Sequence, residues 1–279
     1  MTRVLKSLSE IASDYDAIVL DQWGVLHDGS AAYPGTAAAL KHLIARGTRL
    51  AVLSNSGKRA APNRARIAAM GFSSGLFDCV MTSGEALWRD IANGTIPGRR
   101  FFPVERTKGD ARAWATDLAI DLMPDLNSAE AVLLMGLPDG TNLSDWQPLL
   151  EEAASRHLRI YCSNPDKASP RAGGQTVMSP GALADVHAAA GGDVVYYGKP
   201  FKPVFVSLAQ ALGTDRLLMV GDSLEHDIAG ADAAGWDSVL IQGGLYASDF
   251  SIGDADRTLA RLCAEKNTPF PTYRLELLR

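Results

Sequence analysis

The chain has 279 residues, which is long enough for one large domain or two of medium size. Hydrophobic residues make up 47% of the sequence and charged residues 21%, fractions typical of a globular protein rather than a disordered or fibrous one. The net charge is −5 and basic residues form no run, which argues against binding to nucleic acid or to an anionic membrane surface.

The N-terminal residues and the cysteines indicate a cytoplasmic protein. Charged residues interrupt positions 1–20, which therefore lack the apolar segment of a signal peptide. No window approaches the roughly 18 consecutive apolar residues of a transmembrane helix, so we expect no membrane partner. Cys79, Cys162 and Cys263 are widely spaced and form no C-x-x-C motif, so we expect reduced thiols that pack as small hydrophobic side chains.

Short apolar strands alternate with amphipathic helices near the start of the chain. The pattern predicts strands at 17–21, 49–54 and 78–82, with helices at 35–46 and 63–70 between them. Strands that alternate with helices in this way form a parallel sheet that carries helices on its faces.

The middle of the chain has its own succession of elements. We predict strands at 131–135 and 158–162 and helices at 110–118, 145–156 and 180–190. Glycine-rich stretches precede and follow this region, and they are suited to hinges. We therefore expect residues 93–191 to form an inserted α/β domain.

The strand–helix alternation returns after the insertion. It predicts strands at 194–197, 217–221 and 238–241 and helices at 203–211 and 227–234. Residues 267–279 contain two prolines, and we expect them to form a loosely packed tail. Residues 1–92 and 192–279 together predict a discontinuous core domain of the α/β class, with a Rossmann-like, doubly wound parallel sheet.

Chemically active side chains stand at the ends of the predicted core strands. Asp21, Ser54, Lys199 and Asp222 each lie at or just after the carboxyl end of a strand. Ligands of open α/β sheets bind beyond these strand ends, so we expect the four residues to converge on one crevice.

These residue types suit phosphoryl transfer. Asp21 is the candidate nucleophile, and the Lys199 ammonium would offset the negative charge of both nucleophile and phosphate. Ser54 and Asn55 offer a hydroxyl and backbone N–H groups to a phosphoryl oxygen, although a capped turn explains these two residues better when they are taken in isolation. Several carboxylates close together repel one another unless a divalent cation joins them, and Mg²⁺ prefers such oxygen ligands.

The order and context of these residues resemble the four motifs of the haloacid dehalogenase (HAD) superfamily. Motif one is the segment 21–29 (DQWGVLHDG), and the others contain Ser54, Lys199, and Asp222 with Asp227. The insertion between the second and third motifs is similar to the class IIA cap of the 4-nitrophenylphosphatase and pyridoxal phosphatase group. Shorter matches to that group occur at 82–86 (TSGEA), 163–166 (SNPD), 180–183 (PGAL) and 198–200 (GKP).

The resemblance implies a role for each of these residues. Asp21 would be the nucleophile, and Mg²⁺ would bind to Asp21, the main-chain carbonyl of Trp23, and Asp222, with Asp227 in support. The cap would supply substrate specificity. Asn164 and Asp166 in the 163–166 loop are candidates to contact substrate, although a structural turn explains them as well. Relatives of this type also imply a homodimer that pairs through its caps.

Trp23 departs from the family pattern. Phosphatases of the family carry a second Asp at this position, which protonates the leaving oxygen and later activates water. An indole can do neither, and loss of general acid–base catalysis costs roughly 10²–10⁴ in rate. The enzyme would then favour good leaving groups, such as aryl or acyl phosphates, or another residue would supply the proton. His27 and His226 are candidates, and each also fits a structural role.

The sequence therefore predicts a Mg²⁺-dependent HAD-type hydrolase that acts on a small phosphorylated metabolite through an aspartyl-phosphate intermediate. Two alternatives remain. Trp23 favours a non-catalytic protein that binds a phosphorylated metabolite. Dehalogenation is a further alternative because haloacid dehalogenases carry an aromatic residue at this position, but that reaction needs no metal, whereas Asp222 and Asp227 indicate one.

Overall fold

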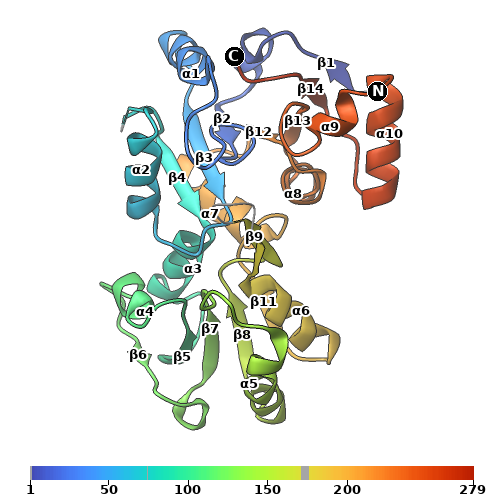
Figure 1. The fold of residues 1–279 in the computed structure, drawn as a ribbon. Helices are drawn as coiled ribbons and strands as arrows, with labels where there is room; N and C mark the ends of the chain where they lie inside the picture. Colours follow the sequence, from blue (N-terminus) through green and yellow to red (C-terminus); the bar gives the residue numbers. More distant parts are fainter. Residues whose placement is uncertain (1, 74, 171–175) are drawn as a thin grey trace. The chain divides into compact units, whose positions relative to one another are not determined.

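The computed structural model describes residues 2–73, 75–170 and 176–279. The chain forms two compact units (Figure 1). The first contains Met1–Ser54, Ala61–Met81 and Lys199–Arg279, and the second contains Asn55–Ala60 and Thr82–Gly198. No helix within the described ranges is both long and apolar enough to cross a membrane.

The first unit is built on a sheet that, over the described residues, runs β1-β14-β13-β12-β2-β3-β4. Its strands are β1 (Arg3–Val4), β2 (Ala17–Leu20), β3 (Leu50–Ser54), β4 (Cys79–Thr82), β12 (Leu217–Gly221), β13 (Asp237–Ile241) and β14 (Tyr273–Leu275). Its helices are α1 (Thr36–Ala45), α2 (Ala60–Ala69), α7 (Lys202–Leu212), α8 (Ala229–Ala234), α9 (Ala247–Phe250) and α10 (Ala255–Lys266), with short turns η1 (Leu8–Glu10), η2 (Ala12–Asp14) and η5 (Leu224–Ile228, π-helical).

Strand β2 lies at the centre of this sheet, between β3 and β12, and pairs with both in parallel. The chain winds outward from β2 to β3 and β4 on one side, and later from β12 to β13 and β14 on the other. The strand order thus reverses next to β2, and such a reversal opens a crevice at the carboxyl ends of the strands.

Both faces of the first unit's sheet are covered, because alternate side chains of a strand point to opposite faces. In β13, Val239 and Ile241 belong to a hydrophobic cluster that includes Leu40 of α1. Leu240, between them, belongs to a second cluster with Leu259 of α10. The predicted α/β class with a doubly wound parallel sheet is confirmed.

The second unit has its own parallel sheet, which runs β11-β8-β7-β5-β6 through the described residues. Its strands are β5 (Arg100–Val104), β6 (Asp121–Leu122), β7 (Ala131–Leu134), β8 (Arg159–Cys162) and β11 (Val194–Tyr196), and a separate antiparallel pair joins β9 (Ala168–Pro170) to β10 (Thr176–Met178). Its helices are α3 (Ser83–Ala92), α4 (Asp110–Trp114), α5 (Leu143–Ser155) and α6 (Pro180–Ala189), with a 3₁₀ turn η3 (Leu126–Ser128).

Two expectations about these elements were wrong. Strand β11 was expected in the core sheet, but it pairs with β8 of the second unit, in the register Val195 opposite Tyr161. The C-terminal residues were expected to be a loose tail, but β14 pairs with both β13 and β1. Leu275 and Leu278 are buried in the core cluster of the first unit, so the end of the chain is part of the core.

We predict that Leu275→Ala lowers the free energy of unfolding by about 2–4 kcal/mol, because it leaves a cavity between β14 and its neighbours. Urea unfolding would show this as a lower midpoint with an unchanged slope. Phe270→Ala is the matched control, since Phe270 lies in the same segment but is 59% exposed. Equal, small effects of both substitutions would contradict the account of β14 as a core strand.

Candidate active site

The register of the central strands brings Asp21 and Asp222 to the same edge of the sheet. Leu20 of β2 is opposite Val220 of β12, and the backbone N–H of Asp21 donates to the Val220 carbonyl at 2.9 Å. On the other side, Leu20 is opposite Val52 of β3. The carboxyl ends of all three strands therefore meet where Asp21 and Asp222 leave the sheet.

Lys199 joins two carboxylates of this site. Its Nζ donates to Oδ1 of Asp21 and to Oδ1 of Asp227, both at 2.6 Å. Lys199 and Asp227 are fully buried, and Asp21 is partly exposed. Burial alone would lower the pKa of the Lys199 ammonium, but the charges of Asp21 and Asp227 outweigh it, so the pKa is raised and the group stays charged.

The chain fixes Asp227 through the turn that follows β12. Oδ2 of Asp227 accepts the backbone N–H of Ser223 at 3.0 Å. Gly221 lies directly against this carboxylate, because a Cβ added there would come within 2.1 Å of Asp227 Cγ. The expected helix start at Asp227 was wrong: the π-helical turn η5 begins at Leu224 and contains Asp227, and α8 follows it.

Two glycine-containing loops hold Asp222. The backbone N–H of Leu245 donates to Oδ2 of Asp222 at 2.8 Å. A Cβ on Gly24 would come within 1.6 Å of that oxygen, and one on Gly244 within 2.4 Å of Asp222 Cβ. Gly24 also has φ +76°, which side chains rarely adopt, so both space and conformation require glycine there.

The carboxylates repel one another electrostatically. Burial raises the pKa of Asp222, and the charges of Asp21 and Asp227 raise it further. Burial also raises the pKa of Asp21, and the Lys199 charge only partly offsets this effect. The Lys199 ammonium pairs with Asp21 and Asp227, whereas the raised pKa of Asp222 reflects burial and repulsion that this ammonium only partly offsets.

This donor set suits a divalent cation. Asp21, Asp222 and Asp227 each offer an oxygen, and these oxygens lie within 4.8 Å of one another. Hard oxygen donors of this kind are the ligands that Mg²⁺ and Ca²⁺ prefer. The expected ligand from the Trp23 main chain stays a prediction, although the adjacent Gly24 does contact Asp222.

Trp23 extends from the loop that follows Asp21. Its side chain is 45% exposed, and its ring meets the ring of His27 edge to face at 6.1 Å. His27 itself is fully buried, and its Nδ1 accepts the backbone N–H of Gly29 at 3.0 Å. Burial, with the Arg66 charge in addition, lowers the pKa of His27 to about 4. His27 is therefore a neutral structural residue, and it does not fit the role of proton donor.

His226 is held within the η5 turn. Its backbone N–H donates to Oγ of Ser223, and its Nδ1 lies 3.3 Å from the same oxygen. Ser223 thus caps the turn, and these contacts describe a local structural role for His226.

Comparisons with known proteins place this geometry in a family. Residues 18–108 match the haloacid dehalogenase-like hydrolase family, and residues 196–258 match the family described as HAD-hydrolase-like. Together the two matched segments contain the ends of β2, β3 and β12, where the carboxylates and Lys199 lie. Both matched families are haloacid dehalogenase-like hydrolases, so the resemblance predicted from the sequence is confirmed.

Individual proteins resemble most of the chain. Chronophin of Bos taurus is 27% identical over 97% of this chain and 93% of its own length. The D-glycerol 3-phosphate phosphatase of Mycobacterium tuberculosis is 28% identical over 86% of this chain and 67% of its own length. A crystal structure of a haloacid dehalogenase-like hydrolase from Brucella suis 1330 matches with a TM-score of 0.80 and 27% identity, over 99% of this chain and all of that one. The predicted class IIA group and phosphatase-type hydrolase are confirmed.

The other predicted superfamily residues lie at the second motif and in the second unit. Ser54 ends β3 and is half-buried. Nδ2 of Asn55 donates to Oδ1 of Asp166 at 2.8 Å, and Oδ1 of Asn164 accepts the backbone N–H of Asp166 at 3.0 Å. The side chain of Asn164 therefore closes a turn, while its role and that of Asp166 toward substrate stay predictions.

Sequence reasoning missed the groups that hold Asp222, namely Gly24, Gly244 and the Leu245 N–H. A signal for Gly244 and Leu245 was present, because the Gly243–Gly244 pair follows one residue after the end of strand β13. A glycine pair at such a strand end indicates close approach of the backbone to another group.

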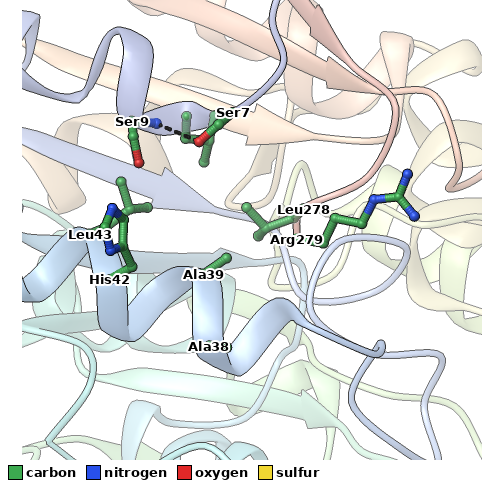
Figure 2. A pocket seen from close by; sticks show the side chains of 9 residues that line it. Ser7, Ser9, Ala38, Ala39, His42, Leu43, Leu278 and Arg279 are labelled. Atoms are coloured by element: carbon green, nitrogen blue, oxygen red, sulfur yellow. Dashed lines mark hydrogen bonds between the residues drawn. The ribbon is translucent and has the colours of Figure 1, made fainter.

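A separate pocket of about 300 Å³ lies on the first unit (Figure 2). Residues of η1, α1 and the C-terminal end line it: Ser7, Leu8, Ser9, Ala38, Ala39, His42, Leu43, Leu278 and Arg279. The Arg279 guanidinium points away from the other labelled side chains (Figure 2). None of the site carboxylates lines this pocket, so it is distinct from the candidate active site.

We predict that His27 makes the protein less stable in acid. In the unfolded chain His27 is protonated below about pH 6.5, whereas in the folded chain it is protonated only below about pH 4. The free energy of unfolding therefore falls as the pH drops through this window. Over the whole window the loss of unfolding free energy is roughly 3 kcal/mol. His27→Asn keeps an acceptor for the Gly29 N–H but cannot titrate.

The test is urea unfolding of both proteins between about pH 7 and pH 4.5. The unfolding free energy of His27→Asn should fall less steeply than that of the wild type. Parallel curves would contradict the buried, neutral state of His27.

Proposed function

We propose that the protein is a Mg²⁺-dependent phosphatase that hydrolyses a small phosphorylated metabolite through a phosphorylated Asp21. The observation that carries the proposal is the group formed by Asp21, Lys199, Asp222 and Asp227 at the edge of the first unit's sheet. A single buried ammonium and a set of carboxylates suited to a divalent cation are the parts that phosphoryl transfer to an aspartate requires.

In this proposal each residue has a defined task. An oxygen of Asp21 attacks phosphorus, and the bond from phosphorus to the leaving oxygen breaks. Lys199 orients Asp21 and offsets the charge of the phosphoryl group. Asp21, Asp222 and the Trp23 carbonyl would hold Mg²⁺, with Asp227 in support, and Mg²⁺ when bound would neutralise charge on the phosphoryl oxygens. Ser54 and Asn55 would bind those oxygens.

Trp23 determines whether the protein can transfer a proton to the leaving group or from the attacking water. Since the indole cannot donate a proton usefully, the leaving group departs as an anion that carries the bonding electron pair. Water then attacks phosphorus, the bond to Asp21 breaks, and the proton of the water passes to the released phosphate. Neither step uses a protein acid or base, so we expect turnover to be roughly 10²–10⁴ slower than with such a group present.

One of the named relatives supports the substrate class. It acts on D-glycerol 3-phosphate, as its name states. This substrate is a small phosphorylated metabolite. For this chain we propose the same general class, with residues 93–191 as the cap that supplies specificity through Asn164 and Asp166.

Trp23 also favours a second candidate function, a protein that binds a phosphorylated metabolite without turnover. In that case the carboxylates and Lys199 would still bind Mg²⁺ and phosphate. The two candidates differ in one measurable property, the release of inorganic phosphate.

We predict Mg²⁺-dependent phosphate release from a panel of aryl, acyl and alkyl phosphates, with aryl and acyl esters preferred. Asp21→Asn should lower turnover by at least about 10³-fold, because an amide is a poor nucleophile. Asp232→Asn on α8 is the matched control, since Asp232 is exposed and should leave turnover unchanged. EDTA should abolish the activity and added Mg²⁺ should restore it.

Activity that persists in Asp21→Asn or in EDTA would contradict the proposed mechanism. If no substrate is turned over but a phosphate mimic binds only with Mg²⁺, the second candidate function is correct.

A further inference from the structure

Trp23 combines a fixed position with an accessible ring. A Cβ added to Gly29 would come within 2.2 Å of Cζ2 of Trp23, so the indole rests directly on the backbone of Gly29. The ring of the buried His27 meets it edge to face at 73°. These contacts restrict the indole on one side, yet 45% of the side chain remains exposed.

The backbone of Trp23 is tied to the carboxylate site. The next residue, Gly24, lies against Oδ2 of Asp222, and its N–H donates to the His27 carbonyl at 3.1 Å. Trp23 also stands two positions after Asp21. The exposed ring therefore belongs to the loop that carries the proposed nucleophile. The backbone of this loop, at Gly24, lies against Asp222, a predicted metal ligand.

A second exposed apolar residue is held at the same carboxylate by its backbone. Leu245 is 60% exposed, and its own N–H donates to Asp222. Removing exposed apolar side chains from water is favourable in free energy. Large apolar side chains that are exposed next to a buried charged cluster therefore favour a ligand that covers them. Within the described residues, the indole N–H of Trp23 makes no hydrogen bond that would direct the ring elsewhere.

We propose that Trp23 is a specificity-determining residue that stacks on a planar aromatic leaving group of the phosphate ester, with Leu245 as a further apolar contact. This inference rests on the proposed phosphatase function. A stacking role explains why a tryptophan suits position 23, where phosphatases of the family carry a proton-donating Asp. An aryloxide is a stable enough anion to depart with the electron pair of the broken phosphorus–oxygen bond, so the group that the ring would bind needs no acid.

A purely structural role for Trp23 makes a different prediction. If the ring served only to cover Gly29, its replacement would lower activity on every substrate alike. Stacking instead acts on aromatic esters alone, and aromatic contacts of this kind correspond to about threefold to tenfold in affinity.

The test compares kcat/KM for 4-nitrophenyl phosphate and acetyl phosphate, which both have good leaving groups but differ in the aromatic ring. Trp23→Leu should lower the ratio of the aryl to the acyl value by about threefold to tenfold, through KM for the aryl ester. Trp23→Phe keeps a ring and should retain most of the ratio. Phe270→Leu, an exposed aromatic outside the site, should leave it unchanged. An unchanged ratio in Trp23→Leu would overturn the inference.

A binding experiment separates this inference from the proposed function. Phenylphosphonate and methylphosphonate cannot be hydrolysed, and calorimetry in the presence of Mg²⁺ measures their affinities directly. Tighter binding of phenylphosphonate, lost in Trp23→Leu, would support the stacking role even if no ester were turned over. Equal affinities in the wild type would contradict it even if the protein proved to be a phosphatase.

Discussion

The structure of the site depends on one constraint, the close approach of three carboxyl groups, two of them buried, to the Lys199 ammonium. Lys199 bridges Asp21 and Asp227, but among the residues that the structure describes Asp222 receives only a backbone N–H, from Leu245. Buried charges of the same sign are costly unless they are paired. The glycines at 24, 221 and 244 allow the backbone to approach these carboxylates closely, and a cation would remove the remaining repulsion.

The parts of the site that follow from strand ends could be predicted from the sequence. Asp21 and Asp222 directly follow buried apolar strands, and parallel strands end at a common edge, so their convergence needs no long-range information. Lys199 was found through its place in the Gly198–Pro200 segment. Its contact with Asp227, in contrast, depends on the π-helical turn η5, which no hydrophobic periodicity indicates.

Other parts could not be predicted because they depend on distant segments of the chain. Strand β14 is three residues long and follows a proline, so its sequence resembles a tail. Only its pairing with β13 and with β1, which lies at the other end of the chain, makes it a strand. The same reason explains β11, whose local pattern is that of any parallel strand and does not specify which sheet it joins.

In the proposed mechanism, Trp23 leaves the groups that bind metal and phosphate in place but removes a proton donor. The predicted metal ligands and Lys199 do not need an acidic side chain at this position, whereas proton transfer does. The account therefore predicts a functional nucleophile, slow hydrolysis, and accumulation of the intermediate whenever the leaving group is good.

Mass spectrometry of the acid-quenched protein can detect a phosphorylated aspartate directly. During turnover of 4-nitrophenyl phosphate with Mg²⁺, we expect one added phosphoryl group, located on Asp21, and none in a sample quenched without Mg²⁺. Phosphate release from a protein that never carries a phosphoryl group, or that carries it on another residue, would show that Asp21 is not the nucleophile.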